Sequence, residues 1–423
     1  MKLLVNICSY DGISTHYCGV GTMIRRYIKS IICYCESKKL DYKLNLYTAE
    51  SFEYTLGYNE NLEKFHISLP NTNLYKISNG SNGETSFGTL ENWKVLSENT
   101  ASLINNMDFY EYDKVITLIH DTPYCDLVKK IKKCDNHDVI WIPHSTVKIH
   151  GYSSDEKKSN YDLEYRYAYE QSAVDYINKC DNFYLGACGN FIGSHMIKEY
   201  NLHPDKILYI LNGELLNQEK QCEDIEKCKK LFNEIKDYNE IILSFGRAEQ
   251  YKNLEATMFL GKEMNIKPVV IAQSYYKDQP IIKYYKKIAK ETNTKLFVDV
   301  PFSLPHYILQ NFKNRIILLV PSKKEIMGLV INEIRKLNKN NILIVANNID
   351  GLKEQVNDMV DGLLVDLYNI KESNEKIKKN LRDEIICEMN YESQKTLKEK
   401  YDFYVNLSYF MDKLLCFNKD DVE

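Results

Sequence analysis

The chain has 423 residues, of which 44% are hydrophobic, and this length favours two or three domains with a sizeable buried core. Its 55 lysines and arginines against 59 aspartates and glutamates leave a formal charge of -4, so we expect no nucleic-acid partner. The 12 cysteines form no C-x-x-C pair, which indicates neither a zinc site nor a disulfide framework.

The apolar stretch at the start of the chain is too short for a signal peptide. No apolar run approaches the roughly 18 residues that suggest a membrane span. We therefore expect a cytoplasmic protein without a transmembrane segment, an interpretation that leaves room for peripheral contact with a membrane surface.

A glycine turn follows the first predicted strand. Residues 3–7 form an apolar run, and Gly19 and Gly21 then lead into a helix whose Ile24 and Ile28 share one face. A glycine turn after a first strand is typical of a phosphate-binding loop. It is not the dinucleotide fingerprint G-x-G-x-x-G, because Ile24 occupies the position of the third glycine.

Two histidines lie at the ends of predicted strands. The strand at residues 114–119 ends at His120, and the strand at residues 139–142 is followed by His144. Ligands gather at the carboxyl ends of strands in an open α/β sheet, so both histidines are candidates, although a single strand-end histidine is more often structural. Residues 78–88, rich in Asn, Ser and Gly, are predicted to be a mobile loop bordering an acceptor site.

The rest of the first half also alternates strands with helices. Strands are predicted at residues 41–47, 183–187 and 206–211, and helices at residues 161–179 and 190–200. Charged and apolar residues alternate at residues 215–238, where we place the domain boundary.

Two cations flank the turn after the next strand. Residues 240–246 form this strand, and Arg247 and Lys252 follow its terminal Gly246. Surface cations are usually solvated. Their position after a strand and a glycine favours instead a clamp for a diphosphate, in which Arg grips two oxygens and Lys acts as a point charge.

The stretch RIILLVPSKKEIMGLVINEIRKL combines a strand, a turn and a helix. Glu325 lies in the turn, and Glu333 lies in the first turns of the helix. The first amides of the helix lack helical partners and lie at the positive end of its dipole, which predicts a seat for phosphate. These amides belong to Gly328, Leu329 and Val330.

The second half shows the same alternation. Strands are predicted at residues 269–272, 296–298, 316–320 and 342–346, and helices at residues 281–289, 304–312 and 391–415. Strands alternating with helices imply a second parallel, doubly wound sheet. The predicted domains are residues 1–214 and 215–390, followed by a C-terminal helix within residues 391–423.

The segment EIMGLVINE resembles the E-x7-E motif of retaining glycosyltransferases with the GT-B fold, in particular glycosyltransferase family 4. The resemblance implies that Glu325 contacts the donor sugar, that Glu333 holds the ribose of the nucleotide, and that the intervening amides hold the diphosphate. Met327, Asp350 and Cys18 depart from the family pattern.

Further segments resemble the same family, in the same order along the chain. The turn at Gly19 and Gly21 is similar to a family turn whose backbone approaches the donor phosphates. Arg247 and Lys252 match the positions that hold the diphosphate, and His144 resembles the histidine that contacts the transferred sugar. By the same resemblance, the C-terminal helix crosses back onto the first domain.

The resemblance also implies a fold and a reaction. The fold would be α/β with GT-B architecture, in which two Rossmann-like, doubly wound parallel-sheet domains face across a cleft. The reaction would move a hexosyl group, with retention of configuration, from a nucleotide diphosphate sugar to a hydroxyl acceptor, either a glycan or a small molecule. UDP is the commonest donor nucleotide in the family, and domain closure would exclude water.

We expect neither a metal nor a cofactor, the nucleotide sugar being a substrate. The chain has no D-x-D pair of the kind that holds a metal in other glycosyltransferases. Arg247 and Lys252 would instead stabilise the charge that grows on the leaving diphosphate.

Three other hypotheses stay open at this point. A sugar-nucleotide epimerase shares the GT-B architecture and would need no acceptor. A non-catalytic nucleotide-sugar-binding protein would bind the donor without turnover. A dinucleotide dehydrogenase is disfavoured because the third glycine is missing. The donor base, the sugar, the acceptor, the linkage and the oligomeric state stay open too.

Overall fold

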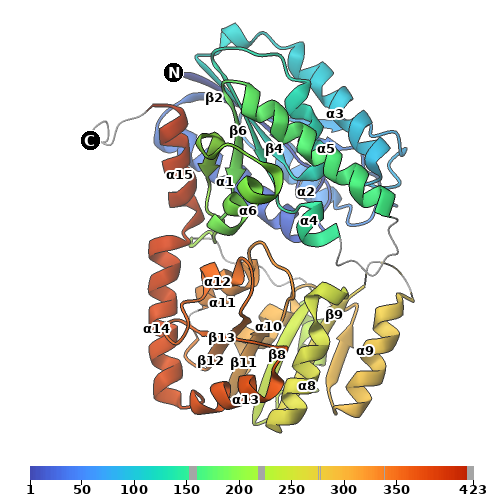
Figure 1. Cartoon of the computed structure of the whole chain (residues 1–423), viewed down its shortest axis with the longest axis vertical. Helices are drawn as coiled ribbons and strands as arrows, with labels where there is room; N and C mark the ends of the chain where they lie inside the picture. Colours follow the sequence, from blue (N-terminus) through green and yellow to red (C-terminus); the bar gives the residue numbers. More distant parts are fainter. Residues whose placement is uncertain (152–159, 218–223, 275, 277, 338, 417–423) are drawn as a thin grey trace. The chain divides into compact units, whose positions relative to one another are not determined.

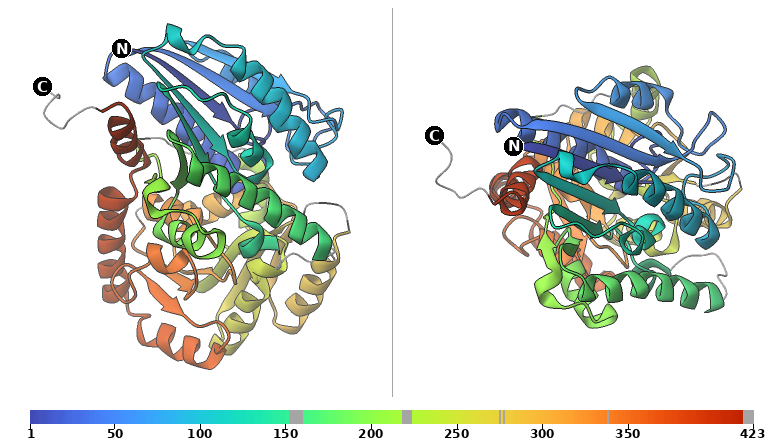
Figure 2. Two further views of the ribbon diagram at one scale, coloured as in Figure 1. Left: turned by 45° about the horizontal axis from the view of Figure 1, so that its top comes forward. Right: turned by 90° about the horizontal axis from the view of Figure 1, so that it is seen from above.

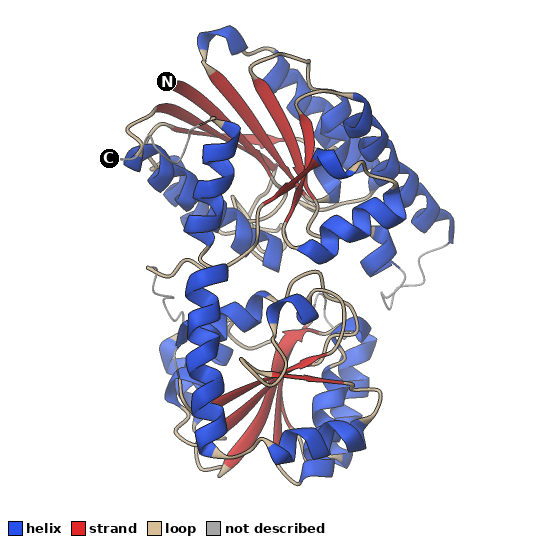
Figure 3. Cartoon of the chain, turned by 60° about the vertical axis from the view of Figure 1, so that its left-hand side comes forward, coloured by secondary structure: helices blue, strands red, loops and turns tan. Residues whose placement is uncertain are grey.

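The computed structural model describes residues 1–151, 160–217, 224–274, 276, 278–337 and 339–416 (Figure 1). These residues divide into two compact units. The first comprises the described residues up to Asn212 together with those from Phe403 onward, and the second comprises the described residues from Gly213 to Asp402. In each unit, helices cover both faces of a parallel sheet (Figure 3).

Within its described residues, the first unit contains a seven-stranded parallel sheet with the strand order β3-β2-β1-β4-β5-β6-β7. β1 and β4 are neighbours, and the chain winds outward from them in both directions. The central strands are buried because they are nearly continuous apolar runs. The strands are β1 (Lys2–Cys8), β2 (Asp41–Ala49), β3 (Thr72–Ile77), β4 (Lys114–His120), β5 (His137–Ile142), β6 (Phe183–Ala187) and β7 (Ile207–Tyr209).

Helices of the first unit connect these strands. They are α1 (Gly19–Ser37), α2 (Glu60–Ile67), α3 (Leu90–Asn105), α4 (Val147–His150), α5 (Asn160–Lys179) and α6 (Asn190–Tyr200), with short 3-10 helices η1 (Phe109–Glu111), η2 (Thr122–Lys129) and η4 (Pro204–Lys206). The predicted strands and helices of this half are confirmed, with ends that differ by a few residues. β3 had no sequence signal, because it is a half-buried edge strand without an apolar run.

A ladder of polar side chains crosses the first sheet from β3 to β5. Asn73 Nδ2 donates to Asn45 Oδ1 (3.0 Å), and Asn45 Nδ2 donates to Asn6 Oδ1 (3.1 Å). Asn6 Nδ2 donates to Thr117 Oγ1 (3.1 Å), which lies 2.8 Å from His137 Nε2. The three asparagines and Thr117 are paired across neighbouring strands, so the amides stack side by side on one face. We call these five residues the polar ladder.

The loop predicted at residues 78–88 indeed contains neither helix nor strand. Its own hydrogen bonds close it. Asn79 is buried and donates from Nδ2 to the carbonyl of Thr85 (2.8 Å), and Trp93 Nε1 donates to the carbonyl of Phe87 (2.7 Å). The loop therefore has a defined, hydrogen-bonded conformation.

The described residues of the second unit form a six-stranded parallel sheet with the order β10-β9-β8-β11-β12-β13. The strands are β8 (Glu240–Arg247), β9 (Lys267–Gln273), β10 (Lys295–Val298), β11 (Arg315–Val320), β12 (Ile342–Asn347) and β13 (Leu363–Val365). The helices are α7 (Ile225–Phe232), α8 (Leu254–Met264), α9 (Pro280–Glu291), α10 (Leu304–Asn311), α11 (Leu329–Leu337), α12 (Leu352–Gln355), α13 (Ile370–Lys379) and α14 (Asp383–Lys400), with a 3-10 turn, η5 (Gln250–Lys252). The prediction of a second doubly wound sheet is confirmed.

The prediction of one C-terminal helix at residues 391–415 is wrong, because two helices occupy this region. α14 ends at Lys400, and α15 spans Phe403–Leu414. The carbonyl of Tyr401 accepts a hydrogen bond from the amide of Glu214 (2.8 Å), and the Tyr401 hydroxyl donates to the carbonyl of Glu354 (2.7 Å). These contacts break the helical ladder at Tyr401. α15 belongs to the first unit, where it packs against α1 (Figure 2).

Candidate active site

The predicted diphosphate clamp lies where the winding of the second sheet reverses. β8 and β11 are neighbours there, and the loops after their carboxyl ends carry the predicted residues. Lys252 Nζ lies 2.7 Å from Glu325 Oε2, an ion pair in which both side chains keep partial solvent exposure. Ser322 Oγ donates to the same carboxylate oxygen (3.3 Å). The structure therefore brings together Lys252 and Glu325, which are 73 positions apart in the chain.

Arg247 lies at the end of β8 in a separate ion pair. Its guanidinium contacts the Tyr251 hydroxyl, and Nη2 lies 3.2 Å from Glu249 Oε2. Burial raises the pKa of Tyr251, while the charge of Arg247 opposes that shift. At Gly246, a Cβ atom would meet no described atom within 4 Å, so the backbone beside Arg247 borders open space. Open backbone next to a cation suits an anionic ligand.

Gly351 contacts the segment between β11 and α11 that carries Glu325, which we call the Glu325 loop. The amide of Gly351 donates to the carbonyl of Glu325 (2.9 Å), and a Cβ atom at Gly351 would lie 1.7 Å from the carbonyl oxygen of Ile326. Only glycine permits this approach. Asp350, which departs from the family pattern, has a positive φ of 39°, and burial raises its pKa.

The predicted amide cradle at the start of α11 needs one correction. The amide of Leu329 donates to the carbonyl of Met327 (3.0 Å), so it has a partner within the turn. Among the described residues, we find no hydrogen-bond acceptor for the amides of Gly328 and Val330. Two of the three predicted amides thus keep the property that the phosphate seat requires.

Glu333 projects from α11 toward α10. Its Oε2 lies 3.4 Å from Nε2 of His306, whose side chain is mostly buried. His306 lies in the first turn of α10, and no sequence pattern pointed to it.

The second predicted group lies in the first unit, at the carboxyl ends of β4 and β5. Nδ1 of His120 lies 3.0 Å from Nε2 of His144. Burial lowers the pKa of His144 to about 4. Burial, followed by the proximity of His144, also lowers the pKa of His120 well below its ordinary value. Both imidazoles are therefore neutral near pH 7.

Asp121 fixes the backbone between these strands. Its φ of 65° and ψ of 178° are a conformation that costs a non-glycine residue roughly 1–3 kcal/mol. Oδ1 accepts from the amide of His144 and Oδ2 from the Tyr10 hydroxyl, both at 3.3 Å, and the Asp121 carbonyl accepts from Trp141 Nε1 (3.1 Å). Burial raises the pKa of Asp121, and the charge of Arg166 opposes this. Contacts from the ends of β1 and β5, the two strands that neighbour β4, stabilise this strained conformation.

The turn at Gly19 and Gly21 encloses an aspartate. Asp11 Oδ2 accepts from the amide and the thiol of Cys18, both at 3.1 Å, and burial raises the pKa of Asp11. A Cβ atom at Gly21 would lie 2.5 Å from Asp11 Oδ2, which gives this glycine a packing role. Gly19 is exposed at the first turn of α1. Approach of this turn to a donor phosphate stays a prediction.

Arg166 and Glu170 support the loop that follows His144. Arg166 Nε donates to Glu170 Oε1 (2.8 Å), and Arg166 Nη2 donates to Ser145 Oγ (3.2 Å). The fully buried Glu170 also accepts from the amide of Val147 (3.0 Å). This buried charge pair ties α5 to the residues just beyond His144.

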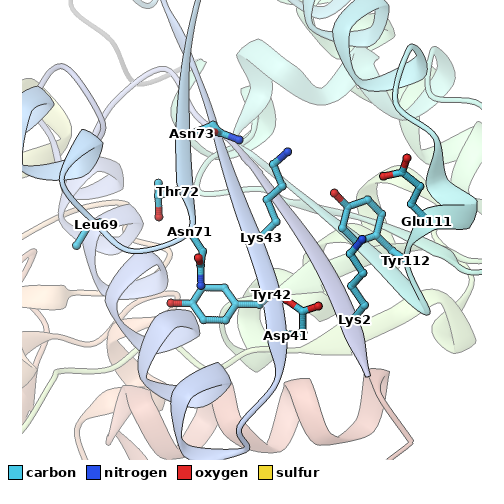
Figure 4. Close-up of a pocket in the computed structure, with 10 residues that line it drawn as sticks. All are labelled: Lys2, Asp41, Tyr42, Lys43, Leu69, Asn71, Thr72, Asn73, Glu111 and Tyr112. Atoms are coloured by element: carbon cyan, nitrogen blue, oxygen red, sulfur yellow. The ribbon is translucent and has the colours of Figure 1, made fainter.

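A pocket of about 550 Å³ opens at the other end of the first sheet, near the amino ends of β1, β2 and β3 (Figure 4). Lys2, Lys43, Asn73 and Tyr112 are among its lining residues, and Lys2 Nζ lies 4.9 Å from the centre of the Tyr112 ring. Because His144 follows the carboxyl end of β5, this pocket is separate from the predicted site.

Two features are absent from the described residues. No group of three or more His, Cys, Asp or Glu side chains in them could hold a metal ion. None of the helices in the described part of the chain is long and apolar enough to cross a membrane.

Comparison with known proteins identifies the second unit and the fold. Residues 227–400 match the model of the family described as glycosyl transferases group 1. The sequence matches no curated protein.

Solved structures match over nearly the whole chain. Sucrose-phosphate synthase from Thermosynechococcus elongatus has a TM-score of 0.73 at 12% identity, covering 98% of this chain and 100% of its own. HepE from Anabaena, solved with UDP, has a TM-score of 0.66 at 14% identity, covering 99% and 100%. A glycosyltransferase from Rickettsia africae has a TM-score of 0.64 at 15% identity, covering 99% of each chain. Likeness at such identity establishes the fold. Residues 227–400 thus form a glycosyl transferases group 1 domain, and the chain is a glycosyltransferase with the GT-B fold.

Proposed function

We propose that this glycosyltransferase moves a sugar from a nucleotide diphosphate sugar to a hydroxyl acceptor, with retention of configuration and without a metal ion. The observation that carries the proposal is the pairing of Lys252 with Glu325 at the carboxyl ends of neighbouring strands, beside Arg247 and the start of α11. Cations suit the diphosphate, and a carboxylate suits the hydroxyl groups of the sugar.

Arg247 and Lys252 supply the charge that a metal ion supplies elsewhere. Each is paired with a carboxylate, Glu249 or Glu325, in the present structure. A diphosphate carries more negative charge than one carboxylate and gains more as the sugar leaves, so it competes for both cations. The amides of Gly328 and Val330 add neutral donors at a helix start.

We further propose UDP as the donor nucleotide. HepE has been solved with UDP and with UDP-glucose, and the structural match to HepE covers 98–99% of this chain. The acceptor is a hydroxyl group on a glycan or a small molecule.

The pairing of Glu325 bears on the route by which the configuration of the sugar would be retained. A carboxylate held by Lys252 and Ser322 is a weaker nucleophile than an unpaired one, which disfavours a covalent sugar–Glu325 intermediate. We propose instead that the attacking hydroxyl and the leaving diphosphate share one face of the sugar. His144 is the residue that we propose to contact the transferred sugar.

Calorimetric titration with UDP, GDP and ADP tests this function. We expect selective binding of UDP, weakened about tenfold or more by Arg247→Ala because a charge-assisted hydrogen bond contributes roughly 1.5–3 kcal/mol. The matched control is Arg315→Ala, which removes an arginine at the amino end of β11 and should leave binding unchanged.

Product analysis completes the test. The proton spectrum of the product should show the anomeric configuration of the donor, and turnover should persist in excess EDTA. Failure of UDP, GDP and ADP to bind would overturn the proposed donor site, and an inverted product would overturn the proposed stereochemistry.

A further inference from the structure

The contact between His120 and His144 links the last residue of β4 to the loop after β5. β4 and β5 are parallel neighbours, with His120 beside Ile142, two positions before His144. Nδ1 of His120 and Nε2 of His144 are 3.0 Å apart, and the two rings are nearly parallel, with an angle of 17° between their planes. His120 is fully buried.

The protonation state of the pair determines which nitrogen of His144 can meet a ligand. Since both imidazoles are neutral, one ring donates an N–H group and the other offers a lone pair. In either arrangement, Nε2 of His144 is occupied by His120. Within the described residues, Nδ1 of His144 has no hydrogen-bond partner.

We infer that His120 is a positioning residue, whose hydrogen bond fixes the ring orientation and the tautomer of His144 so that His144 meets the substrate through Nδ1. This inference rests on the proposed role of His144 in contacting the transferred sugar. Asp121 holds the backbone of His144, and His120 holds its ring, so both constraints originate at the end of β4.

Packing alone does not explain a histidine at position 120. Nε2 of His120 is buried without a hydrogen-bond partner, and the Tyr27 ring packs at 4.8 Å from the His120 ring. A buried polar atom without a partner lowers stability, so an apolar side chain would suit this site better. Among the described residues, His144 is the hydrogen-bond partner of the His120 side chain.

Two substitutions separate positioning from packing. His120→Phe keeps a planar ring and removes the hydrogen bond, whereas His120→Asn places an amide near the position of Nδ1 and can restore it. The matched control is His137→Gln, which changes another buried histidine of the first unit, at the amino end of β5.

Nitrogen-15 spectra of the imidazoles test the inference without any substrate. We expect one tautomer of His144 in the wild type and in His120→Asn, and a mixture of tautomers in His120→Phe. In turnover assays, His120→Phe should lower kcat about tenfold with little change in the donor KM, and His120→Asn should recover most of that loss. His137→Gln should retain the wild-type kcat.

A mixture of tautomers in the wild type would overturn the inference, even if His120→Phe did not fold. Equal turnover by His120→Phe and His120→Asn would overturn it as well. If the wild type turned over no nucleotide sugar, the proposed function would fail, while the spectra would still decide whether His120 positions His144.

Discussion

The sequence predicted single site residues at strand ends, but it did not predict every residue that contacts them. Arg247, Lys252 and Glu325 could be placed from sequence because each follows an apolar run that had to be a strand, and parallel strands bring their carboxyl ends together. His306 contacts Glu333 from α10, a segment distant in sequence. No local pattern encodes such contacts.

Asp11 and Asp121 occupy an intermediate position. Both follow predicted strands within a few residues, so the strand-end rule that selected His120 and His144 would have selected them too. Their roles, which are to accept hydrogen bonds from Cys18 and from His144, depend on the folded loops. The sequence could therefore nominate these carboxylates without assigning their partners.

We expect alanine substitutions at two glycines of the second unit to differ in their effect on the free energy of unfolding. Gly351→Ala would place a Cβ atom 1.7 Å from the carbonyl oxygen of Ile326, so the Glu325 loop must move. We expect a loss of about 2–4 kcal/mol in the free energy of unfolding, and loss of turnover. Gly246→Ala meets open space, and we expect wild-type stability from it.

Urea titration of both variants, with nucleotide binding measured alongside, checks this pair. If Gly246→Ala keeps its stability and loses UDP affinity, the backbone at Gly246 borders the donor. Equal stability of the two variants would show that the Glu325 loop tolerates a Cβ atom at position 351.

At the scale of elements, α11 is the helix that combines the candidate site with a buried charge. Arg335 Nη2 lies 3.0 Å from Asp361 Oδ2, with both side chains fully buried, and Arg335 Nε donates to Ser393 Oγ on α14 (3.1 Å). Glu333 lies two positions earlier, on a part of the helix that is not fully buried. Arg335 therefore anchors the helix that positions Glu333.

Arg335→Met should destabilise the second unit by about 3–5 kcal/mol, because it leaves the Asp361 carboxylate buried without its charge partner. Arg335→Met combined with Asp361→Leu should recover part of this loss, since the orphaned charge is removed. Urea unfolding followed by circular dichroism measures both effects.

Arg315→Met is the control for Arg335→Met. Its partner Asp383 is largely exposed, so we expect a change below about 1 kcal/mol. Similar losses from the two arginine substitutions would contradict the importance of burial at Arg335.

The break between α14 and α15 shows why the sequence did not predict where these two helices end and begin. Residues 391–415 have a helical pattern throughout, and neither proline nor glycine interrupts them. The backbone of Glu214 and the carbonyl of Glu354 bind Tyr401 and interrupt the helix. A tertiary contact overrides local helical preference here.

At the scale of the whole molecule, both parallel sheets could be predicted from the alternation of strands and helices, whereas the strand orders come from the structure. The resemblance to GT-B glycosyltransferases extended this to nearly the whole chain, although identity to the matched structures is only 12–15%. Fold at such distance is carried by the pattern of apolar runs, which tolerates substitution, and donor identity is carried by individual contacts, which do not.

We expect the free energy of unfolding of the first unit to fall at low pH, because its buried histidines are neutral in the folded state and take up protons on unfolding. Burial lowers the pKa of His137 to about 3, so the unfolded chain, with a histidine pKa near 6.5, binds its proton at higher pH than the folded state does. The contribution of neutral His137 to the free energy of unfolding is therefore fully present above about pH 6.5, and it is lost as the pH falls toward 3. Burial raises the pKa of Asp11 and Asp121, which opposes this trend.

A comparison of the wild type with His137→Gln isolates one histidine from the opposing aspartates. Relative to the variant, the wild type should lose about 1.4 kcal/mol of unfolding free energy per pH unit below pH 6.5. Both tryptophans of the chain, Trp93 and Trp141, are buried in the first unit, so their fluorescence reports its unfolding selectively. A difference that does not change with pH would mean that His137 titrates alike in both states.

The polar ladder has a consequence for how the first sheet reaches its native pairing. Its amides, Asn73, Asn45 and Asn6, all donate in one direction, toward Thr117. A strand paired one residue out of register would turn its amide to the opposite face and leave buried groups without partners, each at a cost of about 1–3 kcal/mol. Apolar strands of similar sequence could otherwise exchange places at little cost. The ladder thus penalises misfolded pairings during folding more than it stabilises the native sheet.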